Sequence, residues 1–251
     1  MPTAAFWFLA SAASASPGRP ALLRLRGGAE QPKTGKVWVT STFTRDHIRF
    51  TKELPSYLGA YIGGGRALSP TTIESVMMTV NSINTCPYCT GLHGQLARMS
   101  GTVVDQQAPE VKFATTFAEE GGRGNKVQDA FEVLIGKIGK GKASSVRALC
   151  WALLWGKTTG NTINSVRGKF TSLRLWKISP FELIMFVYYG PLFAVIGVLN
   201  AMLTIAPNVP PWFSAVFGAF LWLPQALWIS LAGVVSLVLR LLAAPIVGLS
   251  L

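Results

Sequence analysis

One stretch constrains the folding of this chain more than any other: residues 183–239 carry no charged side chain. That is more than twice the roughly 20 residues with which an α-helix crosses the hydrocarbon core of a bilayer. The segment "APNVPP" at residues 206–211 divides the run into two apolar parts. Two such helices in water would expose far more than the few hundred Å² of contiguous apolar surface usual on a soluble monomer. We therefore predict a hydrophobic two-helix hairpin within residues 179–251, and we favour lipid over a large oligomer as its surroundings.

The residues before this run predict where the hairpin begins and how it is oriented. Ser179-Pro180-Phe181-Glu182 forms a capping box with proline at the first helical position. Between Arg123 and Lys177 there are eleven Lys and Arg residues against two acids, whereas residues 206–211 carry no charge. By the positive-inside rule, the preceding domain and the C-terminus lie on the cytosol-like side, stromal or cytoplasmic. This basic stretch also favours anionic lipid headgroups.

The N-terminal 30 residues are typical of a targeting segment. They contain no acid before Glu30, a short apolar run at residues 4–13, and then small residues with Arg19, Arg24 and Arg26. The apolar run is too short to span a bilayer, and the Ser/Ala/Arg-rich remainder resembles an organelle transit peptide. The two parts together resemble a plastid address. We predict a location in an organelle membrane, with a plastid favoured.

Composition separates the apolar C-terminal part from a more soluble domain at residues 31–177. Only 14% of the residues are charged, against roughly 25% in an average soluble protein, and the formal net charge is +12. No nucleic-acid-binding motif is visible, and the positive charge adjoins the apolar run. We therefore predict membrane lipid, and not nucleic acid, as the acidic partner. Three cysteines are too few for a disulfide scaffold.

Residues 31–177 have the pattern of a helical domain. Ser69 is a good N-cap and Pro70 a good first helical residue. Apolar residues then recur at helical spacing up to a break at Asn84, namely Ile73, Val76, Met77, Val80 and Ile83. A second helix is predicted from Pro87 to a glycine cap at Gly101, and further helices are predicted in "DAFEVLIGKIG" and "SSVRALCWALLWGKT". The predicted fold class is all-α.

The segment "NTCPYCTGLHG" at residues 84–94 carries the candidate chemistry. On a helix, Cys86, Cys89 and His93 share one face, with the thiols at the positive end of the helix dipole. That position favours thiolate, and a histidine one turn further on can move a proton to or from it. Glu74 is the only carboxylate between Glu53 and Asp105. If the two helices fold back on each other, Glu74 can orient His93.

This pattern resembles a known family. The arrangement is that of the alkyl hydroperoxidase D-like branch of the carboxymuconolactone decarboxylase family. In this sequence Glu74 is followed after eleven residues by Cys86, after two more by Cys89, and after three more by His93. The resemblance covers residues 55–105 and extends toward residue 175. It implies an all-α fold, a homo-oligomer, and a thiol peroxidase in which Cys89 attacks the peroxide and Cys86 resolves. Glu74 and His93 would form the proton relay. Tyr88 departs from the peroxidase branch, which has a relay histidine at that position.

The resemblance implies an oxidoreductase that reduces an organic hydroperoxide and forms a disulfide between its two thiols. A dithiol reductant, thioredoxin-like or lipoyl, would reopen this disulfide, and the cycle needs no metal and no other cofactor. Helix physics alone would instead choose Cys86 as the nucleophile, because it lies nearer the helix start. We follow the resemblance, since His93 lies one turn from Cys89 and two turns from Cys86.

Several alternatives stay open at this point. A glutaredoxin also carries CPYC but needs a strand leading into it, and structural zinc needs four ligands where one Cys pair is present. The pair could also serve a general dithiol–disulfide oxidoreductase, or be inert in a non-catalytic subunit of a membrane complex. Decarboxylase activity is disfavoured, since the family members with that chemistry lack the Cys pair. Of the remaining residues, we expect Cys150, Trp151 and Trp155 in the core and His47 in solvent.

Overall fold

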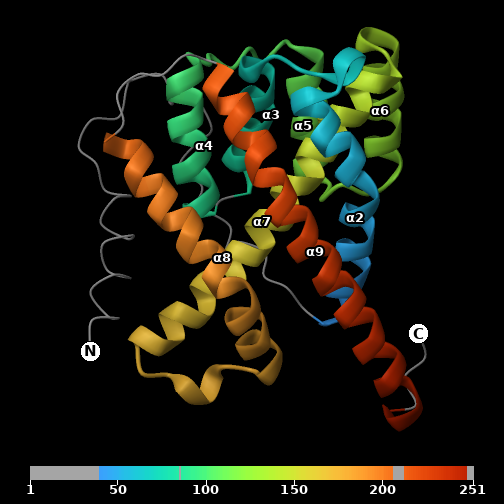
Figure 1. Cartoon of the computed structure of the whole chain (residues 1–251). Helices are drawn as coiled ribbons and strands as arrows, with labels where there is room; N and C mark the ends of the chain where they lie inside the picture. Colours follow the sequence, from blue (N-terminus) through green and yellow to red (C-terminus); the bar gives the residue numbers. More distant parts are fainter. Residues whose placement is uncertain (1–39, 85, 206–211, 248–251) are drawn as a thin grey trace.

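The computed structural model describes residues 40–84, 86–205 and 212–247 (Figure 1). The predicted targeting segment at residues 1–30 and the proline-rich break at residues 206–211 lie outside the described residues. Every regular element in the described part of the chain is a helix, and none is a strand. The predicted all-α class is confirmed.

The first helices are α2 (Thr40–Ile62), a short 3₁₀ turn η2 (Gly64–Arg66), α3 (Pro70–Ile83) and α4 (Pro87–Ser100). Their ends follow the sequence signals. The backbone N–H of Thr72 donates to Ser69 Oγ at 3.1 Å, so Ser69 is the predicted N-cap of α3. Helix α4 ends with the C-cap residue Gly101, which adopts the left-handed conformation with φ 64°, and glycine accepts this conformation without a steric penalty.

The middle of the chain forms α5 (Pro109–Glu119), α6 (Asn125–Ile138) and the long helix α7 (Lys140–Thr171). In Figure 1, α7 crosses the molecule from the α5–α6 side to the turn that leads into α8 (Pro180–Ile205). It contacts α2, α3, α4, α5, α6 and α8. Because α7 contacts all these helices, side chains on its different faces meet the core, the dithiol segment and the apolar helix α8.

Two apolar helices end the described chain, after the 3₁₀ turn η3 (Leu175–Lys177): α8 (Pro180–Ile205) and α9 (Trp212–Val247). The capping box is present, since the Ser179 N–H donates to Glu182 Oε2 at 2.9 Å and the Glu182 N–H donates to Ser179 Oγ at 3.1 Å. Pro180–Thr204 and Val216–Val235 are each long and apolar enough to cross a bilayer. The predicted pair of apolar C-terminal helices is therefore present.

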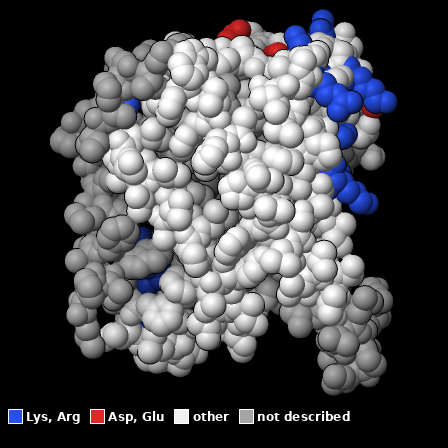
Figure 2. Space-filling model, viewed as in Figure 1, with Lys and Arg blue, Asp and Glu red and all other residues white. Residues whose placement is uncertain are grey.

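These two helices do not extend away from the rest of the protein. Helix α8 packs along α7 and α4, and α9 packs along α2. They meet each other where the Tyr188 hydroxyl donates to the Trp228 carbonyl at 2.9 Å. Figure 2 shows that the side of the molecule formed by their outer surfaces is almost without charged residues, while Lys and Arg gather at its edge.

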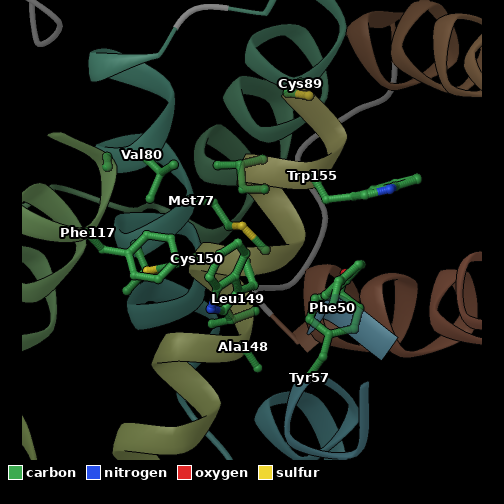
Figure 3. Packing of buried hydrophobic residues seen from close by; sticks show 14 of the residues in the cluster. Phe50, Tyr57, Met77, Val80, Cys89, Phe117, Ala148, Leu149, Cys150 and Trp155 are labelled. Atoms are coloured by element: carbon green, nitrogen blue, oxygen red, sulfur yellow. The ribbon is translucent and has the colours of Figure 1, made fainter. Parts of the chain in front are cut away.

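The core lies around the first half of α7. Figure 3 shows Met77 and Val80 of α3, Phe117 of α5, and Leu149 and Cys150 of α7 gathered in one cluster. Cys150 is fully buried, and burial raises the pKa of its thiol. The prediction that it acts as a small apolar core residue is confirmed. Trp151 and Trp155 are also buried in this core, as predicted.

The prediction of a solvated His47 is wrong. His47 is fully buried, because Phe43, Phe50 and Leu54 recur at helical spacing and place it on the buried side of α2. Its Nδ1–H donates to the Phe43 carbonyl at 2.7 Å. Its Nε2 accepts from the Tyr189 hydroxyl at 2.6 Å and from Trp155 Nε1 at 3.0 Å.

These bonds join α2, α7 and α8 through one neutral imidazole. Burial lowers the pKa of His47 to about 4, so the ring stays uncharged at neutral pH with both nitrogens bonded. The charged neighbours of His47 in the sequence lie on the other side of α2, where Asp46 bonds to Arg123. The sequence motif "TRDHIRF" therefore spans both faces of one amphipathic helix.

Candidate dithiol site

The start of α4 brings the two cysteines together. Cys86 is the N-cap residue with an extended backbone, Pro87 opens the helix, and Cys89 lies in its first turn. Their Sγ atoms are 3.2 Å apart, and both thiols are reduced. Cys86 is fully buried and Cys89 is 8% exposed. The pair is thus close enough to form a disulfide after a small movement of the side chains.

Two glycines of α7 give the sulfur atoms their space. A Cβ atom on Gly160 would lie 2.7 Å from Cys86 Sγ, well inside van der Waals contact. A Cβ atom on Gly156 would lie at an ordinary 3.8 Å from Cys89 Sγ. The two glycines are four residues apart and share one face of α7, so this face lies directly against the dithiol.

The two thiols differ in acidity. The hydrogen bond from the Cys89 thiol favours a thiolate on Cys86 and lowers the pKa of Cys86 below its ordinary value. The same bond, together with burial, raises the pKa of Cys89 well above its ordinary value. Of the two, Cys86 therefore loses its proton more readily, and the Cys89 thiol donates the hydrogen bond that favours this.

A buried lysine beside the pair was not predicted from the sequence. Lys157 is only 1% exposed and donates to the Val80 carbonyl at 2.6 Å, at the C-terminal end of α3. Its charge favours thiolate on both cysteines, and burial lowers the pKa of Lys157 to about 7. A sequence signal exists, since Lys157 is the only charged residue between Arg147 and Arg167.

The predicted contact between Glu74 and His93 is present. Helices α3 and α4 pack against each other, and His93 Nδ1 lies 3.0 Å from Glu74 Oε2. The Glu74 side chain is 3% exposed and the His93 side chain 14%. A buried carboxylate needs a partner, and here it holds the Nδ1 proton of His93. The second ring nitrogen, Nε2, is left to give or accept a proton.

Tyr88 lies between the two cysteines, directly before Cys89. Its ring is 8% exposed and meets Phe193 of α8 edge-on, with ring centroids 5.4 Å apart. Its hydroxyl is buried and has no hydrogen-bond partner within the described residues. Phe193 also faces Gly160, where an added Cβ would come within 2.8 Å of Phe193 Cε1. The apolar helix α8 thus forms part of the wall around the dithiol.

The surroundings bear on the alternative chemistries. The residues before Cys86 form helix α3, whereas a glutaredoxin has a strand there. Across residues 40–84, 86–205 and 212–247 no group of three or more His, Cys, Asp or Glu side chains could hold a metal ion. No protein-family model, curated protein or solved structure matches the chain.

Proposed function

We propose that the chain is a dithiol oxidoreductase that reduces organic hydroperoxides at the Cys86–Cys89 pair. The observation that carries the proposal is the 3.2 Å approach of the two thiols. The Glu74–His93 pair on the neighbouring helices supports it as a source of protons, and Lys157 supports it as a buried positive charge near both sulfurs. A merely structural thiol pair requires neither group.

The reaction takes two steps. A thiolate attacks one oxygen of the hydroperoxide, the O–O bond breaks, and the sulfur becomes sulfenic acid. The alkoxide takes a proton, which His93 can supply, and leaves as the alcohol. The second thiol then attacks the sulfenic sulfur, a disulfide forms, and water leaves. A dithiol reductant, thioredoxin-like or lipoyl, returns two electrons and two protons by thiol–disulfide exchange.

We propose that Cys89 attacks and Cys86 resolves. Cys89 is the more exposed of the two, at 8% against 0%, and it lies one helical turn from His93. A thiolate is favoured on Cys86 over Cys89, but the thiol proton between them lies between sulfurs only 3.2 Å apart. Transfer of this proton to Cys86 produces the Cys89 thiolate without exposing a charge to the apolar surroundings.

The test is hydroperoxide consumption by the purified full chain with cumene hydroperoxide and a dithiol such as dihydrolipoamide. We expect activity in the wild type and its loss in Cys89→Ser and in Cys86→Ser. Cys150→Ala is the matched control, because this third thiol is buried in the core away from the pair. Activity that survives Cys89→Ser would overturn the proposed site.

General dithiol–disulfide exchange is the second candidate, and the lowered pKa of Cys86 favours it, because an acidic thiol is a good leaving group. The same variants separate the two functions. If the wild type does not consume hydroperoxide but reduces a small disulfide, and this activity depends on Cys86, the chain is a general oxidoreductase.

We further propose that the chain associates with an organelle membrane, with a plastid favoured, and that it forms homo-oligomers. The two apolar helices support association with lipid, and the basic residues between 123 and 177 support contact with the anionic lipids of a cytosol-like membrane face. Flotation of the full chain with phospholipid vesicles tests the association. A chain that stays at the bottom of the gradient would reject it.

A further inference from the structure

The outer sides of α8 and α9 form one continuous apolar face. On α9 one set of exposed apolar residues recurs every three or four positions, so its members share one side of the helix. They are Val216, Phe220, Leu223, Leu227, Leu231, Val234 and Val238. Most exposed residues of α8 are also apolar, and they include Leu183, Ile184, Val187, Val195 and Met202. In Figure 2 this side is almost without charge.

The end of α8 that leads into the break is attached to the dithiol domain. The Arg98 guanidinium of α4 donates to the Leu203 carbonyl at 3.1 Å, and Gln95 Nε2 donates to Thr204 Oγ1 at 3.4 Å. In a hairpin that spans a bilayer below the domain, these residues would lie about 30 Å from it, on the opposite side. The observed contacts therefore conflict with a domain on one side of the membrane and the break on the other.

The contacts between α2 and α9 give a second argument against a helix α9 that spans the bilayer. Trp222 Nε1 of α9 donates to the Leu54 carbonyl at 3.1 Å, and a Cβ on Gly233 would lie 3.8 Å from Thr51 Oγ1. The exposed Lys52 thus lies level with the middle of the apolar segment Val216–Val235. If α9 spanned the bilayer, this ammonium group would be at hydrocarbon depth, which is costly for a charged side chain.

The turn before α8 has the composition of a membrane interface. Residues 170–177 are exposed throughout and include Leu173, Leu175 and Trp176, at 75%, 51% and 79% exposure. Arg174 and Lys177 alternate with them and are also exposed. Tryptophan with adjacent basic residues is typical of the headgroup region, where the ring lies among the lipids and the cation meets anionic headgroups.

We propose that α8 and α9 lie in the plane of a membrane surface, with their shared apolar face in one leaflet and the turn at residues 170–177 at its rim. The partner is the surface of a bilayer that contains anionic lipid. This inference rests on the membrane association proposed above and specifies its geometry. It replaces the spanning hairpin expected from the sequence, because α2 and α4 hold both helices alongside the domain.

The length of α9 agrees with this geometry. Its 36 residues give a helix of about 54 Å, longer than the roughly 40–45 Å of a bilayer with its headgroups. A second copy of the chain could also cover an apolar face. The basic and aromatic rim favours lipid, since a protein contact gives no reason for exposed Arg174 and Lys177 beside exposed Trp176.

The test measures depth along α9 by site-directed spin labelling of the full chain on phosphatidylcholine–phosphatidylglycerol vesicles. Single cysteines replace Val216, Leu227 and Val238 in a background in which the three native cysteines are alanine. Collision with oxygen and with a water-soluble nickel complex gives the depth of each label. A label at Val133, which is 65% exposed on α6, is the matched control for a position in water.

We expect all three α9 labels at one shallow depth, about 5–10 Å into the headgroup and acyl boundary, and the Val133 label in water. A spanning helix would place the Leu227 label near the bilayer centre and the other two near opposite surfaces, which would overturn the proposal. Labels that neither oxygen nor the nickel complex reaches would show that a second copy covers the face, and would overturn the proposal that the partner is lipid. Absence of vesicle binding would reject membrane association itself. It would not bear on the proposed dithiol activity, which is tested separately by hydroperoxide consumption.

Discussion

Three glycines of α7 allow a sharp test of how the dithiol is accommodated. An alanine at Gly160 would place Cβ 2.7 Å from Cys86 Sγ and 2.8 Å from Phe193 Cε1. At Gly156 the nearest atom is Cys89 Sγ at 3.8 Å, and at Gly168 nothing lies within 4 Å. All three residues are inside one helix, so the same substitution differs only in what the new methyl group meets.

The expected free energies of unfolding follow from two opposing effects. Alanine is favoured over glycine by about 1 kcal/mol in a helix interior, and this gain applies at all three positions. Overpacking a core typically costs about 1–3 kcal/mol, and this cost applies only at Gly160. Gly160→Ala should therefore be about 1–3 kcal/mol less stable than Gly168→Ala, or roughly 2–4 °C in melting temperature for each kcal/mol. Gly156→Ala should resemble Gly168→Ala.

Thermal unfolding of the vesicle-bound or detergent-bound full chain measures the order of the three variants. The rate of disulfide formation provides a second readout, because the methyl group at Gly160 must displace Cys86 Sγ, whereas the one at Gly168 leaves the pair untouched. Equal melting temperatures and equal oxidation rates for Gly160→Ala and Gly168→Ala would refute the packing of α7 against the dithiol.

The remaining predictions concern the charges and thiols of the site. Glu74→Gln should keep the fold and slow hydroperoxide reduction roughly 10²–10⁴-fold, since His93 loses the carboxylate that orients it; unchanged turnover would make Glu74 purely structural. Mild peroxide should join Cys86 to Cys89 in a disulfide that dithiol reverses, and mass spectrometry that finds both thiols unmodified would contradict this. Lys157→Met should raise the pKa of Cys86, so its alkylation rate at pH 7 should fall, by about tenfold for each pKa unit. Burial lowers the folded-state pKa of Lys157 to about 7, so below that pH the buried charged amine destabilises the native state, and this penalty disappears as pH rises toward the unfolded value of 10.5. The stability gained in Lys157→Met should therefore be largest below pH 7 and shrink above it. Denaturant unfolding of both proteins at several pH values measures this difference.

Short-range signals determined the elements that build the site. Ser69 and Pro70 start α3, Pro87 starts α4, and Gly101 ends it, each through a local hydrogen bond or a backbone preference that involves only nearby residues. The same holds for the capping box at Ser179. Such signals depend on a few consecutive residues, so they can be identified without knowledge of the fold.

The candidate site could be predicted in part. The spacing of Cys86, Cys89 and His93 fixes them on one helix face, and the isolated carboxylate Glu74 could be paired with His93 by its position alone. Lys157 could not be assigned in the same way, because it lies 68 residues beyond Cys89 and reaches the thiols only through the packing of α7. A lone lysine in an apolar helix signals a special environment, but it does not say which one.

The sequence by itself determined that the chain is helical, that two apolar helices end it, and that a dithiol with a nearby histidine opens α4. These properties follow from periodicity, caps and the count of uncharged residues, which are all local. Only the tertiary structure decided that His47 is buried and that Lys157 lies near enough to both thiols for its charge to act on them. It also decided that α8 and α9 lie along α4, α7 and α2. The physical reason is that hydrophobicity measures how strongly a segment avoids water, whereas the packing of its neighbours decides whether lipid, the core or both will cover it.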